Sequence, residues 1–356
     1  MKRNAHVTLD DIAKRLKVSR VTVSKALRGH SDISEATAKK VHLIAKELGY
    51  SPNYMARNLS ARRSNMLGLV VPKIAHFFFG SMIEAVYHAA FENNYETILT
   101  VSHENAERER KHIETLISMR VDGIIISISQ ETKDHEIFEW VRKMGVPLVF
   151  VDRMPEPALP GFSTILIDDR NGTSDAVEEA IKLGYRKIGF LGGGNPWINI
   201  GRNRLLGFED ALRNNGIPIR QDWVIPGGFG KQDGYDGFMK LYKSGDKPEF
   251  LFAATYPVAL GVYEAVKELH LRIPDDIDLM CFGDSDMSQL LSPALSCVSQ
   301  PTDQLGGAAT RAILDIIRSP DKHTEHHVVI PTGLIMRETC KILPSRQRTP
   351  LVTVQV

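Results

Sequence analysis

Cysteine is scarce in this chain, which has three among its 356 residues. Cys281, Cys297 and Cys340 are odd in number and show no CxxC or CxxxC spacing. A disulfide framework and a zinc cage both require paired, suitably spaced cysteines, so neither is predicted. We expect free thiols in the core of a protein from a reducing compartment.

Long apolar runs are also missing. No apolar stretch approaches the roughly 20 residues that a helix needs to span a bilayer. The first eight residues include Lys2 and Arg3 and lead into a helical pattern without the apolar segment of a signal peptide. We therefore expect a cytoplasmic protein with no membrane partner.

Catalytic and cofactor motifs are absent as well. The run Gly192–Gly194 lacks both the GxGxxG spacing of a dinucleotide site and the GK[ST] ending of a P-loop, so we interpret it as a tight turn beside a cleft. His323, His326 and His327 fall in a polar loop without a CxxC or HExxH partner, which favours a solvated loop over a metal site. With no GxSxG elbow and no pair of catalytic carboxylates, we expect no catalytic residue, no cofactor, no metal and no enzymatic activity.

Positive charge is concentrated at one end of the chain. The whole sequence has a formal charge of +1, yet residues 1–63 carry 14 Lys and Arg against 5 Asp and Glu, a formal +9. The remaining 293 residues are at −8. A basic end on an acidic body is typical of a protein that meets nucleic-acid phosphate with one end only.

The basic end contains two short helical patterns that meet at a tight turn. Apolar residues recur at i, i+3, i+4 and i+7 over 9–16 and resume over 21–27, and Lys17-Val18-Ser19 interrupts them. This pattern predicts a helix-turn-helix in which Ser19 caps a second helix that could enter a major groove. A third helix is expected from Ser34 to Gly49. The alternative, a surface hairpin inside a larger domain, would not explain the sign of the charge.

The rest of the chain changes period. We expect strands at 66–71, 97–101, 123–127, 147–152, 164–168, 187–192, 250–254 and 279–283, and helices near 80–92, 106–119, 171–183, 201–215, 231–242, 257–270 and 303–318. Apolar strands separated by helices predict parallel sheets covered on both faces. The number of strands favours two doubly wound parallel-sheet lobes, an α/β body whose cleft would hold a ligand.

The expected domains follow from these patterns. Residues 1–50 form the all-α helix-turn-helix headpiece, and 51–64 form a linker in which Pro52 precedes a helical stretch too short to persist alone in water. The body covers 65–343, with a first lobe of about 65–163 and 300–325 and a second of about 164–299 and 326–343. Residues 344–356 are expected to form a loose tail.

Particular sequence runs resemble those of one family of bacterial transcription factors. They are Thr8–Leu27, Ile33–Val41, Leu48–Asn53, Ala56–Leu59, Val151–Arg153, Gly184–Phe190, Arg202–Phe208, Ala259–Gly261 and Pro293–Pro301. In order and spacing these runs resemble the lactose-repressor (LacI/GalR) family up to about residue 340. The resemblance implies a headpiece joined to two lobes of periplasmic-binding-protein type.

The resemblance also implies which residues bind DNA. Arg20, Val21 and Lys25 would reach base edges, and hydroxyl groups would hold phosphates at Thr8, Ser19, Thr22, Ser24 and Thr37. Lys25 stands where the family more often has Arg, which leaves the preferred base at that contact open, because a point charge replaces a planar fork. Lys17 stands where the family usually has Gly in the turn, which predicts a small strain cost.

For the linker the resemblance implies a hinge helix that folds on the operator. Asn53 and Ala56 would belong to this helix, and Leu59 of each subunit would wedge into the minor groove. An ordinary linker leucine that covers the body is the alternative. The expected partner is a near-palindromic double-stranded operator bound by a homodimer.

The family alignment places a mixed set of side chains around the cleft. They are Phe78, Phe79, Asp152, Arg202, Phe229, Thr255 and Asp284. Arg202 is the foremost candidate, with a salt bridge to a helix acid as its alternative, and core packing is the alternative for each Phe. Thr255-Tyr256 and Gly283 stand where the family often has Asn-Asp and Asp, which weakens the case for a simple monosaccharide. The expected effector is a sugar or sugar derivative, and a modified, acidic or aromatic ligand, or none, stays open.

The function predicted from the sequence is therefore a sequence-specific transcriptional regulator, a repressor whose operator affinity depends on an effector between the lobes. A two-lobed solute-binding protein is the alternative, and it would need an export signal and no basic head. A sugar-processing enzyme would need a catalytic constellation. Effector identity, induction against co-repression, the operator, and dimer against tetramer stay open.

Overall fold

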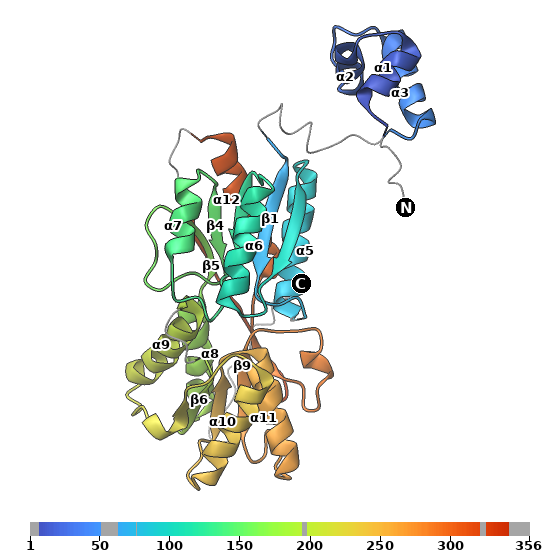
Figure 1. The fold of residues 1–356 in the computed structure, drawn as a ribbon. Helices are drawn as coiled ribbons and strands as arrows, with labels where there is room; N and C mark the ends of the chain where they lie inside the picture. The colour runs from blue at the N-terminus through green and yellow to red at the C-terminus, as the bar shows by residue number, and fades with distance from the viewer. Residues whose placement is uncertain (1–6, 51–62, 76, 194–197, 321–324, 342–356) are drawn as a thin grey trace. The chain divides into compact units, whose positions relative to one another are not determined.

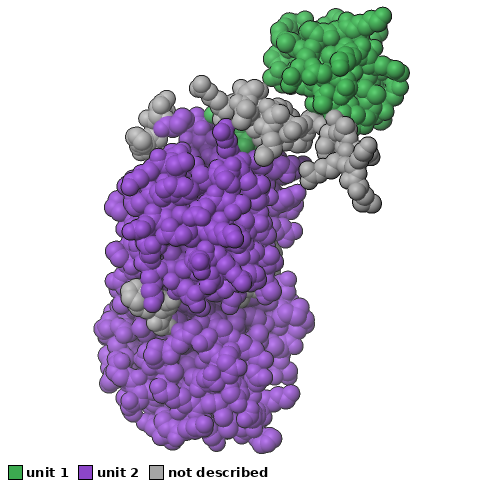
Figure 2. All heavy atoms as spheres, viewed as in Figure 1, with its two compact units in different colours: residues 1–64 green, residues 65–356 purple. Residues whose placement is uncertain are grey.

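The computed structural model describes residues 7–50, 63–75, 77–193, 198–320 and 325–341. The chain divides into two compact units, Met1–Ser64 and Asn65–Val356, which Figure 2 draws in different colours. Among the described residues, every helix is too short or too polar to span a lipid bilayer.

The first unit is built from three helices around a small core. These are α1 (Leu9–Leu16), α2 (Arg20–Leu27) and α3 (Glu35–Glu47). Each begins at a hydroxyl side chain that accepts a hydrogen bond from the third residue after it, and the caps are Thr8, Ser19 and Ser34. The buried side chains are Ile12, Ala13, Val23, Ala26, Val41 and Ala45. The predicted helix-turn-helix with a third helix is therefore confirmed.

The second unit contains two lobes, each with a six-stranded sheet (Figure 1). The first lobe has strands β1 (Met66–Val71), β2 (Glu96–Val101), β3 (Gly123–Ile126), β4 (Leu148–Val151), β5 (Ser163–Ile167) and β11 (His327–Ile330), and helices α5 (Phe77–Glu92), α6 (Ala106–Ser118), α7 (Glu136–Lys143) and α12 (Thr302–Arg318). Its strand order is β11-β5-β4-β3-β1-β2, all parallel.

The second lobe repeats the same plan. Its strands are β6 (Ile188–Leu191), β7 (Val224–Ile225), β8 (Phe250–Ala253), β9 (Asp278–Phe282), β10 (Ser296–Ser299) and β12 (Gly333–Ile335), and its helices are α8 (Asp169–Leu183), α9 (Asn199–Asn214), α10 (Lys231–Lys243) and α11 (Tyr256–Glu268), with 3-10 turns at Gln221–Trp223 and Ser288–Leu290. The order is β12-β10-β9-β8-β6-β7, with β12 antiparallel. The predicted class of two doubly wound lobes is confirmed.

Both faces of each sheet are covered, because the strands are apolar on both sides. In β1, Leu69 belongs to the core shared with α5 and α12, while its neighbour Val70 belongs to the core shared with α6 and α7. All eight expected strands are present with ends within one residue of the prediction. The prediction did not include α7, β7, β10, β11 and β12, which are short.

The predicted boundary between the lobes needs a correction. We expected the second lobe to begin at 164 and again at 326, yet β5 and β11 both lie in the first sheet and pair with each other. Two crossings between the lobes therefore follow β5 and β11, a few residues later than expected, and the third lies between β10 and α12. The parallel strands of both sheets carry the ligand cleft at their carboxyl ends, where Asp152 follows β4 and Gly283 follows β9.

Candidate nucleic-acid interface and ligand cleft

The outer face of α2 presents the three side chains expected to read bases. Val21 is 62% exposed although it is apolar, while Val23 and Ala26 of the same helix are buried. The guanidinium of Arg20 lies 3.8 Å from a carboxylate oxygen of Asp10. Val21 is therefore available for apolar contact with a partner such as a thymine methyl.

Lys25 is already paired inside this unit. Its ammonium group contacts the carboxylate of Asp32, and this hydrogen bond lowers the pKa of Asp32. Both side chains are partly solvent-exposed. A base or phosphate that binds Lys25 has to compete with this intramolecular partner.

The hydroxyl groups expected to hold phosphates serve as helix caps or bond to neighbours. Thr8 donates to Asp11 at 2.7 Å, and Ser24 accepts from Arg28 at 2.8 Å. The remaining contacts are Ser19 with Thr22 at 2.8 Å and Ser34 with Thr37 at 2.8 Å. Thr8, Ser19, Thr22 and Thr37 lie at or near the start of a helix, where backbone N–H groups and the helix dipole also favour an anion, whereas Ser24 lies in the second half of α2.

The turn between α1 and α2 shows the predicted strain. Lys17 has a φ of 53°, which is the left-handed region, and its N–H bonds to the carbonyls of Ala13 and Lys14. A side chain in this region costs about 1–2 kcal/mol relative to glycine's free access to it. Three further DNA-binding predictions, Asn53, Ala56 and Leu59, lie outside the described residues.

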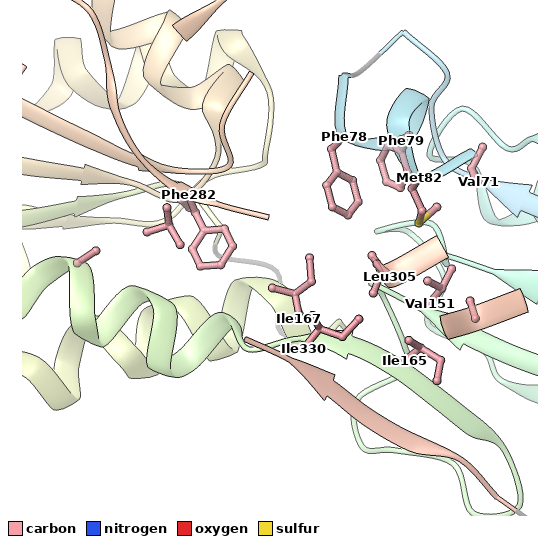
Figure 3. Packing of buried hydrophobic residues seen from close by; sticks show 14 of the residues in the cluster. Val71, Phe78, Phe79, Met82, Val151, Ile165, Ile167, Phe282, Leu305 and Ile330 are labelled. Carbon is pink, nitrogen blue, oxygen red and sulfur yellow. The ribbon is translucent and has the colours of Figure 1, made fainter. Parts of the chain in front are cut away.

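A narrow cleft lies between the two lobes of the second unit, with a cavity volume of about 40 Å³. It is lined by Lys73, Phe77, Phe78, Phe79, Glu104, Asp152, Arg153, Ile200, Arg204, Phe229, Thr255, Tyr256, Phe282 and Gln300. In Figure 3, Phe78 and Phe79 lie on one side of the space between the lobes and Phe282 lies on the other. Five of the predicted effector residues line this cleft: Phe78, Phe79, Asp152, Phe229 and Thr255.

Arg153 connects the lobes through two aromatic rings. Its guanidinium lies 5.4 Å from the ring centre of Phe79 and 5.4 Å from that of Phe229, so one ring comes from each lobe. Nη1 donates to both oxygens of Glu104 at 3.0 Å. Arg153 is 5% exposed, and its Nε is buried without a hydrogen-bond partner.

Arg204 lines the cleft from the second lobe. It projects from α9, donates from Nε to Asp169 at 2.8 Å and from Nη1 to the carbonyl of Ala254 at 2.8 Å. Its guanidinium stacks 3.9 Å from the ring centre of Phe282. The carboxylate partner is almost wholly buried, so removing either charge would leave the other without compensation.

Asp152 sits at the end of β4 with a φ of 62°. Its side chain is 4% exposed and accepts a hydrogen bond from Ser127. Burial raises the pKa of Asp152 to about 6, although the charge of Arg153 opposes the shift. This carboxyl therefore changes charge within a range of pH where most surface acids stay ionised.

The lobes are joined beside the cleft by a short strap, which consists of residues 152–156 of the first lobe and 198–202 of the second. Asn199 donates to the carbonyl of Asp152 at 3.0 Å and accepts from the N–H of Met154 at 2.9 Å. Pro155 and Ile198 form an isolated antiparallel bridge. Phe77 of α5 also meets Tyr256 of α11 edge to face, with ring centres 5.1 Å apart. These contacts bridge the two lobes next to the cleft.

Two predicted effector residues lie elsewhere. Arg202 is about half exposed and forms an ion pair with Glu156, which is the salt-bridge alternative considered for it. Asp284 forms a two-pronged ion pair with Arg337 at 2.9 and 2.8 Å. Neither residue lines the cleft. Each is paired with an opposite charge outside the cleft lining.

The sequence analysis missed Arg204, although a signal for it was present. The buried positions of α9 include 200, 201, 204, 207, 208, 211 and 212, a stripe with helical period. Arg202 and Arg204 are two residues apart, so they point to nearly opposite faces of the helix. The apolar stripe therefore selects Arg204 as the inward arginine. Glu104 and Arg153 follow irregular or strand-end backbone and carry no such periodic signal.

A helix-turn-helix unit joined to a two-lobed ligand-binding unit defines a ligand-responsive DNA-binding regulator. Residues 8–53 match the model of bacterial regulatory proteins of the lacI family, and residues 177–340 match a periplasmic binding protein-like domain. The ribose operon repressor of Haemophilus influenzae is 30% identical over 93% of this chain and 98% of its own. The repressor PurR of Proteus mirabilis is 31% identical over 87% of this chain and 90% of its own.

Among solved structures, the lac repressor dimer bound to operator and the anti-inducer ONPF is similar to this chain with a TM-score of 0.82. It is 25% identical and covers 94% of this chain and 99% of its own. The chain belongs to the lacI family of bacterial regulatory proteins, and it is a DNA-binding transcriptional regulator. The relatives named are regulators of transcription rather than enzymes.

Proposed function

We propose that the protein is a transcriptional repressor whose affinity for a near-palindromic operator is set by a small molecule bound between the lobes. The observation that carries this proposal is the cleft itself, because charged and aromatic side chains from both lobes line it. A ligand that contacts both lobes stabilises a conformation in which the lobes are closed relative to one in which they are open. The resulting coupling between ligand and DNA is typically 1–3 kcal/mol.

In this proposal Arg20, Val21 and Lys25 read base edges. The hydroxyl groups that contact phosphate are those of Thr8, Ser19, Thr22, Ser24 and Thr37. Residues 51–64 act as the hinge, with Leu59 inserted at the centre of the operator. The exposed α2 face and the charge of +9 over residues 1–63 support the assignment. No catalytic role is assigned to any residue.

The protein would act as a homodimer. Tyr87 and Phe91 of α5 are 48% and 63% exposed with nearly parallel rings, and Leu99 lies nearby on the edge strand β2. An exposed apolar surface of this kind is typical of an interface. A second copy of the chain would cover it and bring two reading heads to one operator, as in the lac repressor dimer.

The test is selection of DNA sequences by the full-length protein, followed by binding assays with Arg20→Ala. We expect the selected sites to be near-palindromes, and we expect the variant to lose about 1–3 kcal/mol of discrimination at one base pair of each half-site. Lys111→Gln, which removes an exposed charge on α6, serves as the control. A protein that prefers no sequence over bulk competitor DNA would instead support the solute-binding alternative.

A further inference from the structure

The hydrogen-bond acceptors of the cleft are mostly occupied. Both oxygens of Glu104 accept from Arg153, and one of them also accepts from the N–H of Gln130. The hydroxyl of Thr255 donates to the carbonyl of Phe229. Among the carboxylate oxygens of the described lining, Oδ1 of Asp152 accepts no hydrogen bond, while Oδ2 of Asp152 accepts one from Ser127.

Several hydrogen-bond donors of the cleft, in contrast, lack an acceptor. Nε of Arg153 is buried 3.8 Å from a carboxylate oxygen of Asp152 and makes no hydrogen bond, and its Nη2 has no acceptor among the described residues. Nη2 of Arg204 also lacks one, since Nε and Nη1 take the two acceptors that this side chain has. Lys73 lines the same cleft and forms no ion pair with a described residue. The cationic groups of Arg153, Arg204 and Lys73 therefore each have at least one N–H that donates to no acceptor among the described residues.

Such unsatisfied donors are costly where the side chain is buried. Arg153 is 5% exposed, and its Nε is buried without a hydrogen bond, which destabilises the empty cleft because a charged N–H has left water without gaining an acceptor. A ligand that supplies the missing acceptors recovers this free energy. A planar carboxylate or a phosphate matches the geometry of a guanidinium better than a hydroxyl does.

The remaining lining limits what carries this anion. Phe78, Phe79, Phe229 and Phe282 line the cleft, and aromatic lining of this kind suits the apolar face of a sugar ring. The free oxygen of Asp152 suits a hydroxyl donor. The acidic residue beneath each arginine, Glu104 or Asp169, balances the buried charge and leaves Lys73 as the uncompensated cation of the lining.

We propose that the effector is a hydroxylated ring compound that carries an oxyanion, bound by Arg153, Arg204 and Lys73, with a hydroxyl on Asp152. This inference rests on the proposed function, because it names the chemical class of the ligand that the same cleft takes. Carboxylate and phosphate share the chemistry, and the experiment separates them.

The test compares matched pairs of probes on the full-length protein at constant ionic strength. Glucose, glucuronate and glucose 6-phosphate form one set, and galactose with galacturonate and ribose with ribose 5-phosphate form two more. Tm and calorimetric Kd are measured for each. We expect an acidic member, and not its neutral partner, to raise Tm, and the identity of that member, a sugar acid or a sugar phosphate, tells carboxylate from phosphate.

Variants at Lys73 then link the effect to the cleft. Lys73 is exposed, so its substitution leaves the fold intact, whereas Arg153 and Arg204 variants risk unfolding. We expect Lys73→Gln to weaken binding of the acidic probe at least tenfold, Lys73→Arg to retain it, and the control Lys111→Gln to leave it unchanged.

Three outcomes would overturn the proposal: no acidic probe raises Tm, a neutral sugar binds as tightly as its acid, or Lys73→Gln binds the acid as tightly as the wild type. Each leaves operator selection by the same preparation intact, so failure of this inference differs from failure of the proposed function, which would appear as loss of DNA selectivity.

Discussion

At the scale of single residues, the cleft concentrates buried charge. Asp152 combines burial, a left-handed backbone conformation and a neighbouring cation, Arg153. The raised pKa means that the folded protein holds a proton on this carboxyl at pH values where the unfolded chain has lost it. Stability from this group is complete below the unfolded pKa near 3.8 and is lost as the pH rises through about 6.

We therefore expect Asp152→Asn to change stability in a pH-dependent way. Asparagine resembles the protonated acid and tolerates a positive φ. At pH 4 the free energy of unfolding of the variant should therefore be close to that of the wild type. At pH 7.5 it should be more stable by up to about 3 kcal/mol, because the wild type then holds an ionised buried carboxylate. Denaturant unfolding across this range is the measurement. A constant difference between variant and wild type would contradict the raised pKa.

The residue scale also shows where sequence reasoning succeeded and where it did not. The family alignment placed Phe78 and Phe79 at the cleft, and both lie in the first turn of α5 and line the cleft. Arg202 was predicted from the family alignment and Arg204 was not considered, although both stand in the same run and the helical stripe of α9 distinguishes them. The ion pair between Asp284 and Arg337 joins positions 53 residues apart, and no local pattern carries that information.

At the scale of elements, glycines bring helices of the second lobe into close contact. A Cβ at Gly261 of α11 would lie 2.0 Å from the carbonyl oxygen of Lys231 and 2.5 Å from the backbone nitrogen of Tyr235, both on α10. Backbone atoms cannot move aside as a side chain can. The two helices therefore pack at this distance only because residue 261 has no side chain.

Gly261→Ala should push α10 and α11 apart and destabilise the protein by about 2 kcal/mol or more. The matched control is Gly80→Ala in α5, where an added Cβ meets nothing within 4 Å. That variant should be neutral or more stable by about 0.5–1 kcal/mol, because alanine favours helix. Chemical denaturation of both variants checks the pair. Equal effects would show that the close approach does not govern packing here.

The fold of these elements was largely predictable, and its closing strands were not. Long apolar strands such as β1 and long helices such as α12 carry a strong period over many residues. β11 has only four residues, three of them exposed, so it lacks the apolar signature of a buried strand. β12 has three residues and runs antiparallel at an edge. Their pairing is set by the tertiary structure rather than by local sequence.

At the scale of the whole molecule, the distribution of charge governs how the protein meets DNA. The +9 formal charge of residues 1–63 attracts phosphate, and the −8 of the remainder repels it. Binding to DNA without an operator should therefore be almost entirely electrostatic. The basic end and the acidic body therefore have opposite effects on the affinity for DNA.

We expect the affinity for non-specific duplex DNA to fall steeply with salt. Between 50 and 200 mM salt the loss should reach about 10³-fold if roughly six phosphates are neutralised, because each contact releases counterions. Fluorescence anisotropy titrations with a labelled duplex measure this dependence. A shallow dependence for DNA would mean that the basic end is not the surface that meets phosphate.

The chain passes between the two lobes three times, and β5 and β11, which precede two of these passages, run side by side as neighbours. The lobes are therefore covalently joined at three places next to the cleft, so a ligand bound there contacts two bodies that cannot separate. Under the proposed function, a ligand-dependent change in the angle between the lobes would reach the DNA-binding unit through the residues that precede β1.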